Sequence, residues 1–164
     1  MKRIVTLTIA LILSGAYLSA REQYIYTQIS HDEGLTSTIN SIFKKEDGHL
    51  WIGSQNGLFR CNGTTLRHYK DPVFADKSVN YVGDDSVGDL WVLTDDGLLR
   101  RSGSEEIFEV IGTDQENLQF FSMLCDKEGI WFGSIGKIYR FTYSSQELKV
   151  FCDLTEVSPE FTIQ

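Results

Sequence analysis

Apolar and polar residues repeat along this chain with a period of 40 residues. The three tryptophans are spaced by 40 residues and then by 40 again, at Trp51, Trp91 and Trp131. Each tryptophan follows an aliphatic residue, and a Ser or Thr and then an Arg recur at fixed distances after it: Leu50, Leu90 and Ile130; Ser54, Thr94 and Ser134; Arg60, Arg100 and Arg140. A repeat of about 40 residues is the length of one four-stranded blade of a β-propeller.

Within the first repeat, short apolar runs alternate with pairs of Asp or Asn and Gly. Such pairs predict two-residue hairpin turns of type I′, which need positive φ at both positions. They fall at Asp47-Gly48, Asn56-Gly57 and Asn62-Gly63. They separate four predicted strands, at Ile39–Lys44, Leu50–Ser54, Leu58–Cys61 and Thr65–Tyr69. Four strands joined by tight turns predict an antiparallel meander, which is a blade.

The tryptophans are expected to pack between successive blades. The predicted second strand is apolar nearly throughout, as in Leu50-Trp51-Ile52, so it should be covered on both faces. Gly53 and Gly133 follow their tryptophans by two residues and should leave room for the chain of a neighbouring blade. A platform for stacking sugars is the alternative role for the tryptophans. The core role is preferred because aromatic stripes in repeat proteins usually form the core.

The repeat predicts an all-β fold, an incomplete β-propeller with three four-stranded antiparallel blades and the start of a fourth. The expected divisions are a signal peptide at 1–20, an outer strand and entry loop at 21–35, blade 1 at 36–75, blade 2 at 76–116, blade 3 at 117–157 and a truncated blade 4 at 158–164. Closed rings need at least four blades. We therefore expect a fragment, whether naturally truncated or deliberately shortened, or a small open array that closes by assembling with copies of itself.

The first 20 residues have the composition of a secretory signal peptide. Lys2 and Arg3 precede an apolar run at Ile4–Leu13, and small residues follow it up to Ala20. Ten apolar residues are too few to cross a bilayer core of roughly 30 Å. We therefore expect export to the periplasm, without membrane insertion of the mature chain.

Charge and cysteine content narrow the possible partners. Without Lys2 and Arg3, 13 basic residues face 23 acidic ones, which makes nucleic acid a poor partner. The three cysteines, Cys61, Cys125 and Cys152, occupy different positions of the repeat. They do not predict a disulfide framework or a metal site, and buried apolar packing is their expected role.

No group of residues in the sequence predicts a catalytic or metal site. The three histidines, at His31, His49 and His68, are not brought together by their spacing, and we expect no metal and no cofactor. Acidic pairs occur at Asp84-Asp85, Asp95-Asp96 and Glu105-Glu106. They could support glycoside hydrolysis if they faced each other, but turn formation is the preferred role. For the repeated arginines we expect pairing with a neighbouring blade's acid or with carbonyls, and a ring of anion sites is the alternative. Asn62-Gly63-Thr64 fits a glycosylation acceptor but is better explained as a turn.

The first repeat resembles the two-component regulator propeller repeat. The resemblance lies in Glu33-Gly34-Leu35, Asp47-Gly48, Leu50-Trp51-Ile52-Gly53-Ser54, Asn56-Gly57-Leu58 and Arg60. It is good in the second repeat, although Leu93 replaces the Gly after the Trp, and partial in the third. Such proteins are periplasmic sensor parts of hybrid two-component systems in Bacteroidetes. The resemblance implies signal transduction and oligosaccharide sensing, with a histidine kinase further along a full-length relative.

We therefore expect this chain to be the N-terminal part of a periplasmic sensor propeller, without catalytic activity of its own. The expected partners are an oligosaccharide and either the remainder of the sensor protein or another copy of the chain. The alternatives are a piece of a propeller lyase or glycosidase, or a structural interaction propeller. Propeller ligands usually bind at loops around one mouth of the ring. The corresponding loops are His31–Ser37, Asp71–Ser78 and Thr113–Asn117, and the sequence identifies no ligand-binding residue within them.

Overall fold

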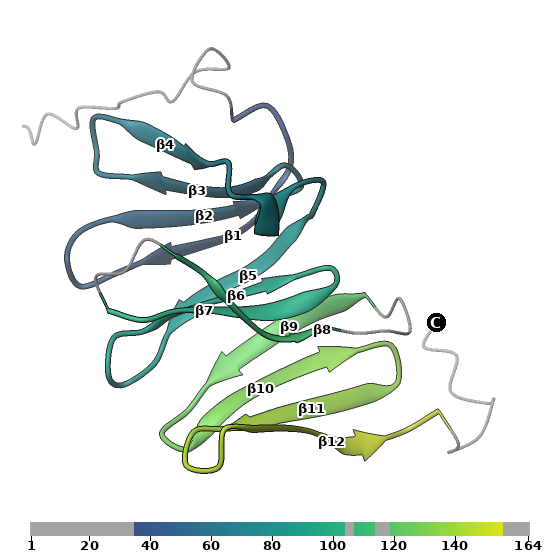
Figure 1. Cartoon of the computed structure of the whole chain (residues 1–164). Coiled ribbons are helices and arrows are strands. Elements are labelled where there is room, and N and C mark those ends of the chain that lie inside the picture. The colour runs from purple at the N-terminus through teal and green to yellow at the C-terminus, as the bar shows by residue number, and fades with distance from the viewer. Residues whose placement is uncertain (1–34, 104–106, 114–118, 156–164) are drawn as a thin grey trace, which may run out of the picture.

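The computed structural model describes residues 35–103, 107–113 and 119–155, which form three separate four-stranded antiparallel sheets (Figure 1). Blade 1 contains β1 (Ile39–Lys44), β2 (Leu50–Ser54), β3 (Gly57–Cys61) and β4 (Leu66–Tyr69). A 3-10 turn, η2 (Pro72–Phe74), leads to blade 2, which contains β5 (Val79–Asp84), β6 (Leu90–Thr94), β7 (Gly97–Arg101) and β8 (Glu109–Thr113). Blade 3 contains β9 (Phe120–Cys125), β10 (Gly129–Ser134), β11 (Lys137–Thr142) and β12 (Glu147–Asp153).

The three blades lie side by side in sequence order, with the first strand of each blade next to the first strand of the following one (Figure 1). Within each blade the strands lie in sequence order, and all neighbours are antiparallel. The all-β, incomplete-propeller prediction is confirmed for the described residues. The four strands predicted in the first repeat are also present, with β3 beginning one residue earlier and β4 one residue later than expected.

The prediction of type I′ turns is wrong. Gly48, Gly57 and Gly63 all have positive φ, but none of the Asp or Asn residues before them does. Between β1 and β2 the chain instead makes a four-residue turn, in which the Gly48 amide donates to the Lys45 carbonyl. The Lys45 amide in turn donates to the carbonyl of His49, the residue after Gly48. The single glycine absorbs the strained conformation, because a residue without Cβ reaches positive φ at little cost.

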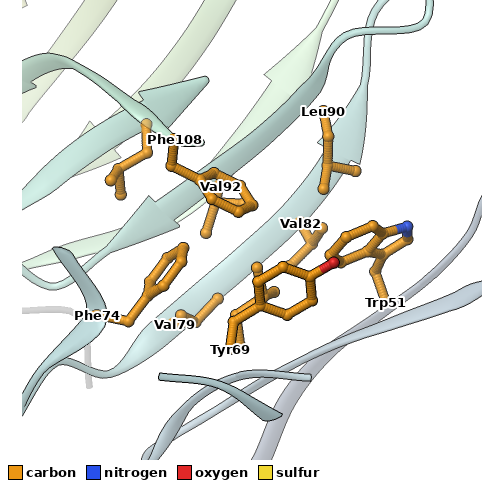
Figure 2. Packing of buried hydrophobic residues seen from close by; sticks show 10 residues of the cluster. Trp51, Tyr69, Phe74, Val79, Val82, Leu90, Val92 and Phe108 are labelled. Atoms are coloured by element: carbon orange, nitrogen blue, oxygen red, sulfur yellow. The ribbon is translucent and has the colours of Figure 1, made fainter. Parts of the chain in front are cut away.

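In blades 1 and 2 the tryptophan packs against the blade that follows it. Trp51 is 1% exposed and shares a buried cluster with Val79 of β5, as Figure 2 shows. Trp91 is fully buried in a second cluster with Phe120 of β9. Trp131, in the last described blade, is half-buried. The predicted packing between blades is therefore confirmed for the first two tryptophans.

A glycine and an asparagine set the spacing between blades 1 and 2. A Cβ added at Gly53 would lie 2.9 Å from the carbonyl oxygen of Val79, so the close approach predicted from the sequence is confirmed there. At Gly133 the nearest atom is Ser122 Oγ of the same blade, at 3.4 Å. Asn40, at a register shift of β1, donates its side-chain amide to Val79 O at 3.0 Å.

Several expectations concern residues outside the described ranges. These are the signal peptide at 1–20, the outer strand at 21–35 and the start of blade 4 at 158–164. Among the described residues, no helix has the length and apolar character needed to span a membrane.

Candidate functional site

A hollow lined by charged, polar and apolar residues lies at the end of blade 1, where the link to blade 2 passes the β2–β3 turn. Its volume is about 520 Å³. Alternating strand directions place the β2–β3 and β6–β7 turns and the β4–β5 link at the same end of the sheets, so the pocket opens at that end. It is lined by Gln55, Asn56, His68, Tyr69, Lys70, Asp71, Phe74, Ala75, Asp76 and Lys77.

The link that forms one wall is shaped by local hydrogen bonds. Asp71 caps η2, because its Oδ1 accepts from the Val73 amide at 3.0 Å. The turn is closed by the Phe74 amide, which donates to Asp71 O at 2.9 Å. Asp76 then adopts φ of 57°, a left-handed conformation that Asp tolerates better than most side chains. The predicted loop Asp71–Ser78 therefore contributes to a pocket.

The opposite wall holds His68 in a defined orientation. Its ring stacks on Phe59, with centroids 4.2 Å apart. Its Nε2 lies 3.0 Å from Asn56 O, and since a carbonyl only accepts, Nε2 carries the proton. Gly57, with φ of 104°, lies between His68 and Phe74, and a Cβ there would be 3.4 Å from the imidazole Nε2.

The charges of the pocket balance. Lys70 and Lys77 are opposed by Asp71 and Asp76. Lys77 is held by Asp96 of the β6–β7 turn, with Nζ and Oδ2 3.0 Å apart. A pocket of this kind offers donors and acceptors without a net field.

The side-chain amides of Gln55 and Asn56 are exposed at the rim, and neither makes a hydrogen bond within the described part of the chain. From its sequence context, Asn56 is predicted only as a turn residue. A turn residue and a ligand-binding residue have the same pattern here, so the sequence carries no separate signal for this site.

The structure does not bring the remaining sequence candidates into one site. His49 lies in the β1–β2 turn, with its Nδ1 3.0 Å from Asp47, at the opposite end from His68. His31 and the pair Glu105-Glu106 lie outside the described residues, as do most of the loops His31–Ser37 and Thr113–Asn117. Within the described ranges, no three His, Cys, Asp or Glu side chains are grouped as for a metal.

The acidic pairs stabilise turns. Asp85 accepts from the Val87 and Asp89 amides and, through Oδ2, from Trp91 Nε1 at 2.9 Å. Asp126 holds Trp131 Nε1 in the same way at 2.7 Å. In the other pair, Asp96 contacts Lys77 and the Thr94 hydroxyl. The preferred role in turns is therefore confirmed for Asp85 and Asp96.

The partners expected for the arginines, an acid from a neighbouring blade or backbone carbonyls, are wrong for two of them. Arg100 Nε donates to Asp89 of its own blade at 2.8 Å, and Arg140 NH2 to Glu128 of its own blade at 2.6 Å. The guanidinium carbon of Arg60 lies over the ring of Trp51 at 5.7 Å. Asp89 and Glu128 each lie in the turn before the second strand of their blade. Antiparallel pairing puts that turn beside the end of the third strand, where the arginine lies.

The pKa of Asp89 records this pairing. Burial opposes its ionisation, but hydrogen bonds from Arg100 and the Gly103 amide outweigh burial and hold the pKa below its usual range.

The three cysteines are free thiols. Burial, followed by the nearby charges of Asp85 and Asp84, raises the pKa of Cys125 to about 12. That thiol stays protonated at neutral pH, so it is a poor nucleophile.

Asn62-Gly63-Thr64 forms a turn, as preferred. Asn62 Oδ1 accepts from the Thr64 amide at 3.1 Å and from the Thr65 amide at 2.8 Å.

Comparison with known protein families gives a match within the first repeat. The model of the two-component regulator propeller family matches residues 33–56, which cover β1, β2 and the turn after them. A search of curated proteins gives no match.

Among solved structures, the chain resembles the extracellular domains of two proteins assigned as hybrid two-component systems of B. thetaiotaomicron. One has a TM-score of 0.63 at 18% identity and covers 81% of this chain and 19% of its own. The other has a TM-score of 0.53 at 20% identity and covers 70% of this chain and 16% of its own. The chain thus spans less than a fifth of either domain.

Virginiamycin B lyase from Staphylococcus aureus is also similar, with a TM-score of 0.59 at 20% identity over 77% of this chain and 44% of the lyase. At these identities the structural similarity shows the fold alone. The match at residues 33–56 adds that the first half of blade 1, with β1 and β2, is similar to the two-component regulator propeller repeat.

Proposed function

We propose that this chain is part of the periplasmic sensor propeller of a two-component signalling protein, and that it has no catalytic activity of its own. The observation that carries the proposal is the family match over residues 33–56. The resemblance to extracellular domains of two-component proteins supports it. The predicted signal peptide at 1–20 is the basis for a periplasmic location.

We further propose that the pocket at the end of blade 1 binds an oligosaccharide. Sugar hydroxyls both donate and accept hydrogen bonds, and the amides of Gln55 and Asn56 offer both groups at the rim. His68 Nε2 already donates to the chain, which leaves its ring fixed as a wall. The balanced charges give no preference for an anion.

A bound ligand would couple blade 1 to blade 2. The pocket includes Lys77, which is anchored to Asp96 of blade 2. A ligand that contacts both Asn56 and the β4–β5 link would favour one relative position of these elements. Sensing would then be a shift between two states that bind the ligand with different affinity.

Calorimetry of the mature chain against a panel of neutral and acidic oligosaccharides tests the binding step. We expect a neutral oligosaccharide to bind, and Asn56→Ala and Gln55→Ala each to weaken binding about tenfold, the effect of losing roughly 1.4 kcal/mol. Ser86→Ala, in the β5–β6 turn at the opposite end, is the control and should bind normally. Absence of binding across the panel, or equal binding by all variants, contradicts the pocket assignment.

A lyase or glycosidase piece is the second candidate, because the lyase from S. aureus shares the fold over 77% of this chain. A structure of an inactive form of that lyase contains quinupristin. Product analysis by mass spectrometry, after incubation of the same oligosaccharides and of quinupristin with the chain, separates the two functions. A sensor leaves every compound intact. Turnover that survives purification to homogeneity would overturn the sensor proposal.

A further inference from the structure

In blade 2, two carboxylates of the β5–β6 turn hold the hydrogen-bond donors beside the tryptophan. Asp85 accepts from Trp91 Nε1 at 2.9 Å, and Asp89 accepts from Arg100 Nε at 2.8 Å. Blade 3 has the same arrangement, with one acid for its indole N–H and another for its arginine. In both blades the turn before the second strand therefore supplies the acceptors.

Blade 1 has the same donors, but the two acids are replaced. At the positions of Asp85 and Asp89, 40 residues earlier, the chain has Lys45 and His49. Trp51 is 1% exposed, and its Nε1 has no hydrogen-bond partner among the described residues. The first blade thus keeps a buried indole donor without the carboxylate that accepts from it in the other two.

Two guanidinium groups lie near the ring of Trp51. Their central carbons, those of Arg60 and Arg101, are 5.7 and 4.8 Å from the ring centroid. Neither arginine forms a salt bridge with another described residue. Arg101 is 6% exposed, and its Nε has no hydrogen-bond partner in the described part of the chain. Buried charges in proteins are normally paired, so both groups favour an anion beside them.

The interface between blades 2 and 3 has a different neighbour for its tryptophan. Phe141 is the residue of blade 3 that corresponds to Arg101, and its ring centroid lies 5.3 Å from that of Trp91. Relative to that interface, the one between blades 1 and 2 has a lysine and a histidine in place of two acids, and a guanidinium in place of an aromatic ring. The surroundings of Trp51 are therefore basic, in a chain whose formal net charge is −8.

A hollow beside Arg60 gives a ligand access to this end of blade 1. Its volume is about 170 Å³, and it is lined by His49, Arg60, Asn62, Thr65 and Arg67. Pockets for drug-sized ligands have roughly 300–1,000 Å³, so this hollow fits one small group. Two acids lie nearby, but Asp47 contacts His49 at 3.0 Å and Asp84 contacts Lys45 at 3.8 Å, so neither is paired with an arginine.

We propose that the hollow beside Arg60 binds the carboxylate group of a small acidic molecule. The Arg60 guanidinium is its main partner, because a planar guanidinium matches the geometry of a carboxylate, and Trp51 Nε1 is the second donor. A carboxylate is the group expected, since blades 2 and 3 hold the equivalent donors with carboxylates. The site is at the end of the sheets opposite the pocket of Gln55 and Asn56, and it does not depend on the proposed oligosaccharide binding there.

Nuclear magnetic resonance of the mature chain tests the proposal through the indole N–H signals of the three tryptophans. Titration with glucuronate at constant ionic strength should move the Trp51 signal in a saturable way. Trp91 and Trp131 are internal references, because Asp85 and Asp126 already accept from their N–H groups. Acetate carries the same group without the sugar. Equal affinity for acetate would assign the site to the carboxylate alone, and tighter binding of glucuronate would assign it to a sugar acid.

Variants separate this site from a general effect of charge. Arg60→Gln should weaken glucuronate binding about tenfold, the effect of losing one charge-assisted hydrogen bond. Arg140→Gln is the matched control, because Arg140 is already paired with Glu128. His49→Asp restores the acid that blade 2 has at this position, so it should pair with Arg60, abolish binding and raise the melting temperature.

Several results would overturn the proposal. One is a Trp51 signal that moves with neither carboxylate, or that moves equally with glucose. Another is equal binding of glucuronate by the wild type and by Arg60→Gln. Tighter binding of sulfate or phosphate than of either carboxylate would overturn the assignment to a carboxylate. Binding that appears only in a chain with Glu105→Gln and Glu106→Gln would overturn it too, because the chain would then supply its own acid.

Discussion

The side-chain amide of Asn40, in the innermost strand of blade 1, donates to the main-chain carbonyl of Val79 in blade 2 at 3.0 Å. It also reaches Ser78 Oγ at 3.0 Å. Asn80 occupies the same register shift one blade later and bonds to Phe120 O. The inner strands of successive blades are thus joined by hydrogen bonds from side-chain amides, in addition to the main-chain hydrogen bonds within each sheet.

Asn40→Ala should lower the free energy of unfolding by about 1 kcal/mol, because a typical hydrogen bond contributes that much and Val79 O loses its donor. Urea unfolding followed by fluorescence measures the change. Asn56→Ala is the matched control, since the Asn56 side chain is exposed and makes no hydrogen bond among the described residues. Equal loss in both variants would contradict the role of the bridge.

Trp91→Phe should destabilise the protein more than Trp51→Phe. Both changes remove a similar volume from a buried cluster, but only Trp91 donates its indole N–H to a carboxylate, that of Asp85. Trp51 Nε1 has no partner among the described residues. A hydrogen bond to a charged group is worth about 1.5–3 kcal/mol, which is the expected difference in unfolding free energy. Thermal unfolding of the two variants side by side measures this difference, and identical unfolding free energies would contradict a stabilising role for the bond from Trp91 to Asp85.

Gly53→Ala should be costly, and Gly133→Ala should be mild. A Cβ at position 53 would lie 2.7 Å from Val79 Cγ1 and 2.9 Å from Val79 O, so blade 2 would have to move. Overpacking of this kind costs about 1–3 kcal/mol. At position 133 the nearest atom is a hydroxyl at 3.4 Å. Chemical denaturation of both variants is the measurement; a tolerated Ala at 53 would show that the blades are less closely packed than described.

Stability should fall in acid, in part through Asp89. Its pKa is lower in the folded protein than the ordinary value of 3.8, so its contribution is fully present above that value. The contribution is lost as the pH falls below 3.8 through the folded pKa. Asp89→Asn should therefore weaken the protein at pH 7 and flatten the decline of the urea midpoint below pH 4. Asp76→Asn, an exposed position, serves as control and should keep the wild-type pH profile.

The repeat made most of the fold predictable. A tryptophan every 40 residues and glycines at the turns were enough to place β1, β2, β3 and β4 within a residue, because both signals come from local backbone requirements. The turn type was not predictable. An Asp-Gly or Asn-Gly pair permits several hairpin loops, and in blade 1 the glycine alone takes positive φ.

The arginine partners and the pocket were harder for a different reason. Arg100 and Asp89 meet because of the register between β6 and β7, which depends on the length of a turn. The pocket depends on the β4–β5 link, where Asp71 caps η2 and Asp76 is left-handed. That link is not part of the repeated pattern, so its shape has no second copy in the sequence from which it could be inferred.

The amide bridge from Asn40 has a consequence for how such a chain can diverge. Its acceptor is a carbonyl, which every amino acid carries, and not a particular side chain. Val79 and Phe120 differ greatly in size, yet the main-chain carbonyl of each accepts the same hydrogen bond from the preceding blade. Neighbouring units can therefore exchange, duplicate or drift in sequence while the donor alone is kept, which is one physical route to long arrays whose members have little identity to one another.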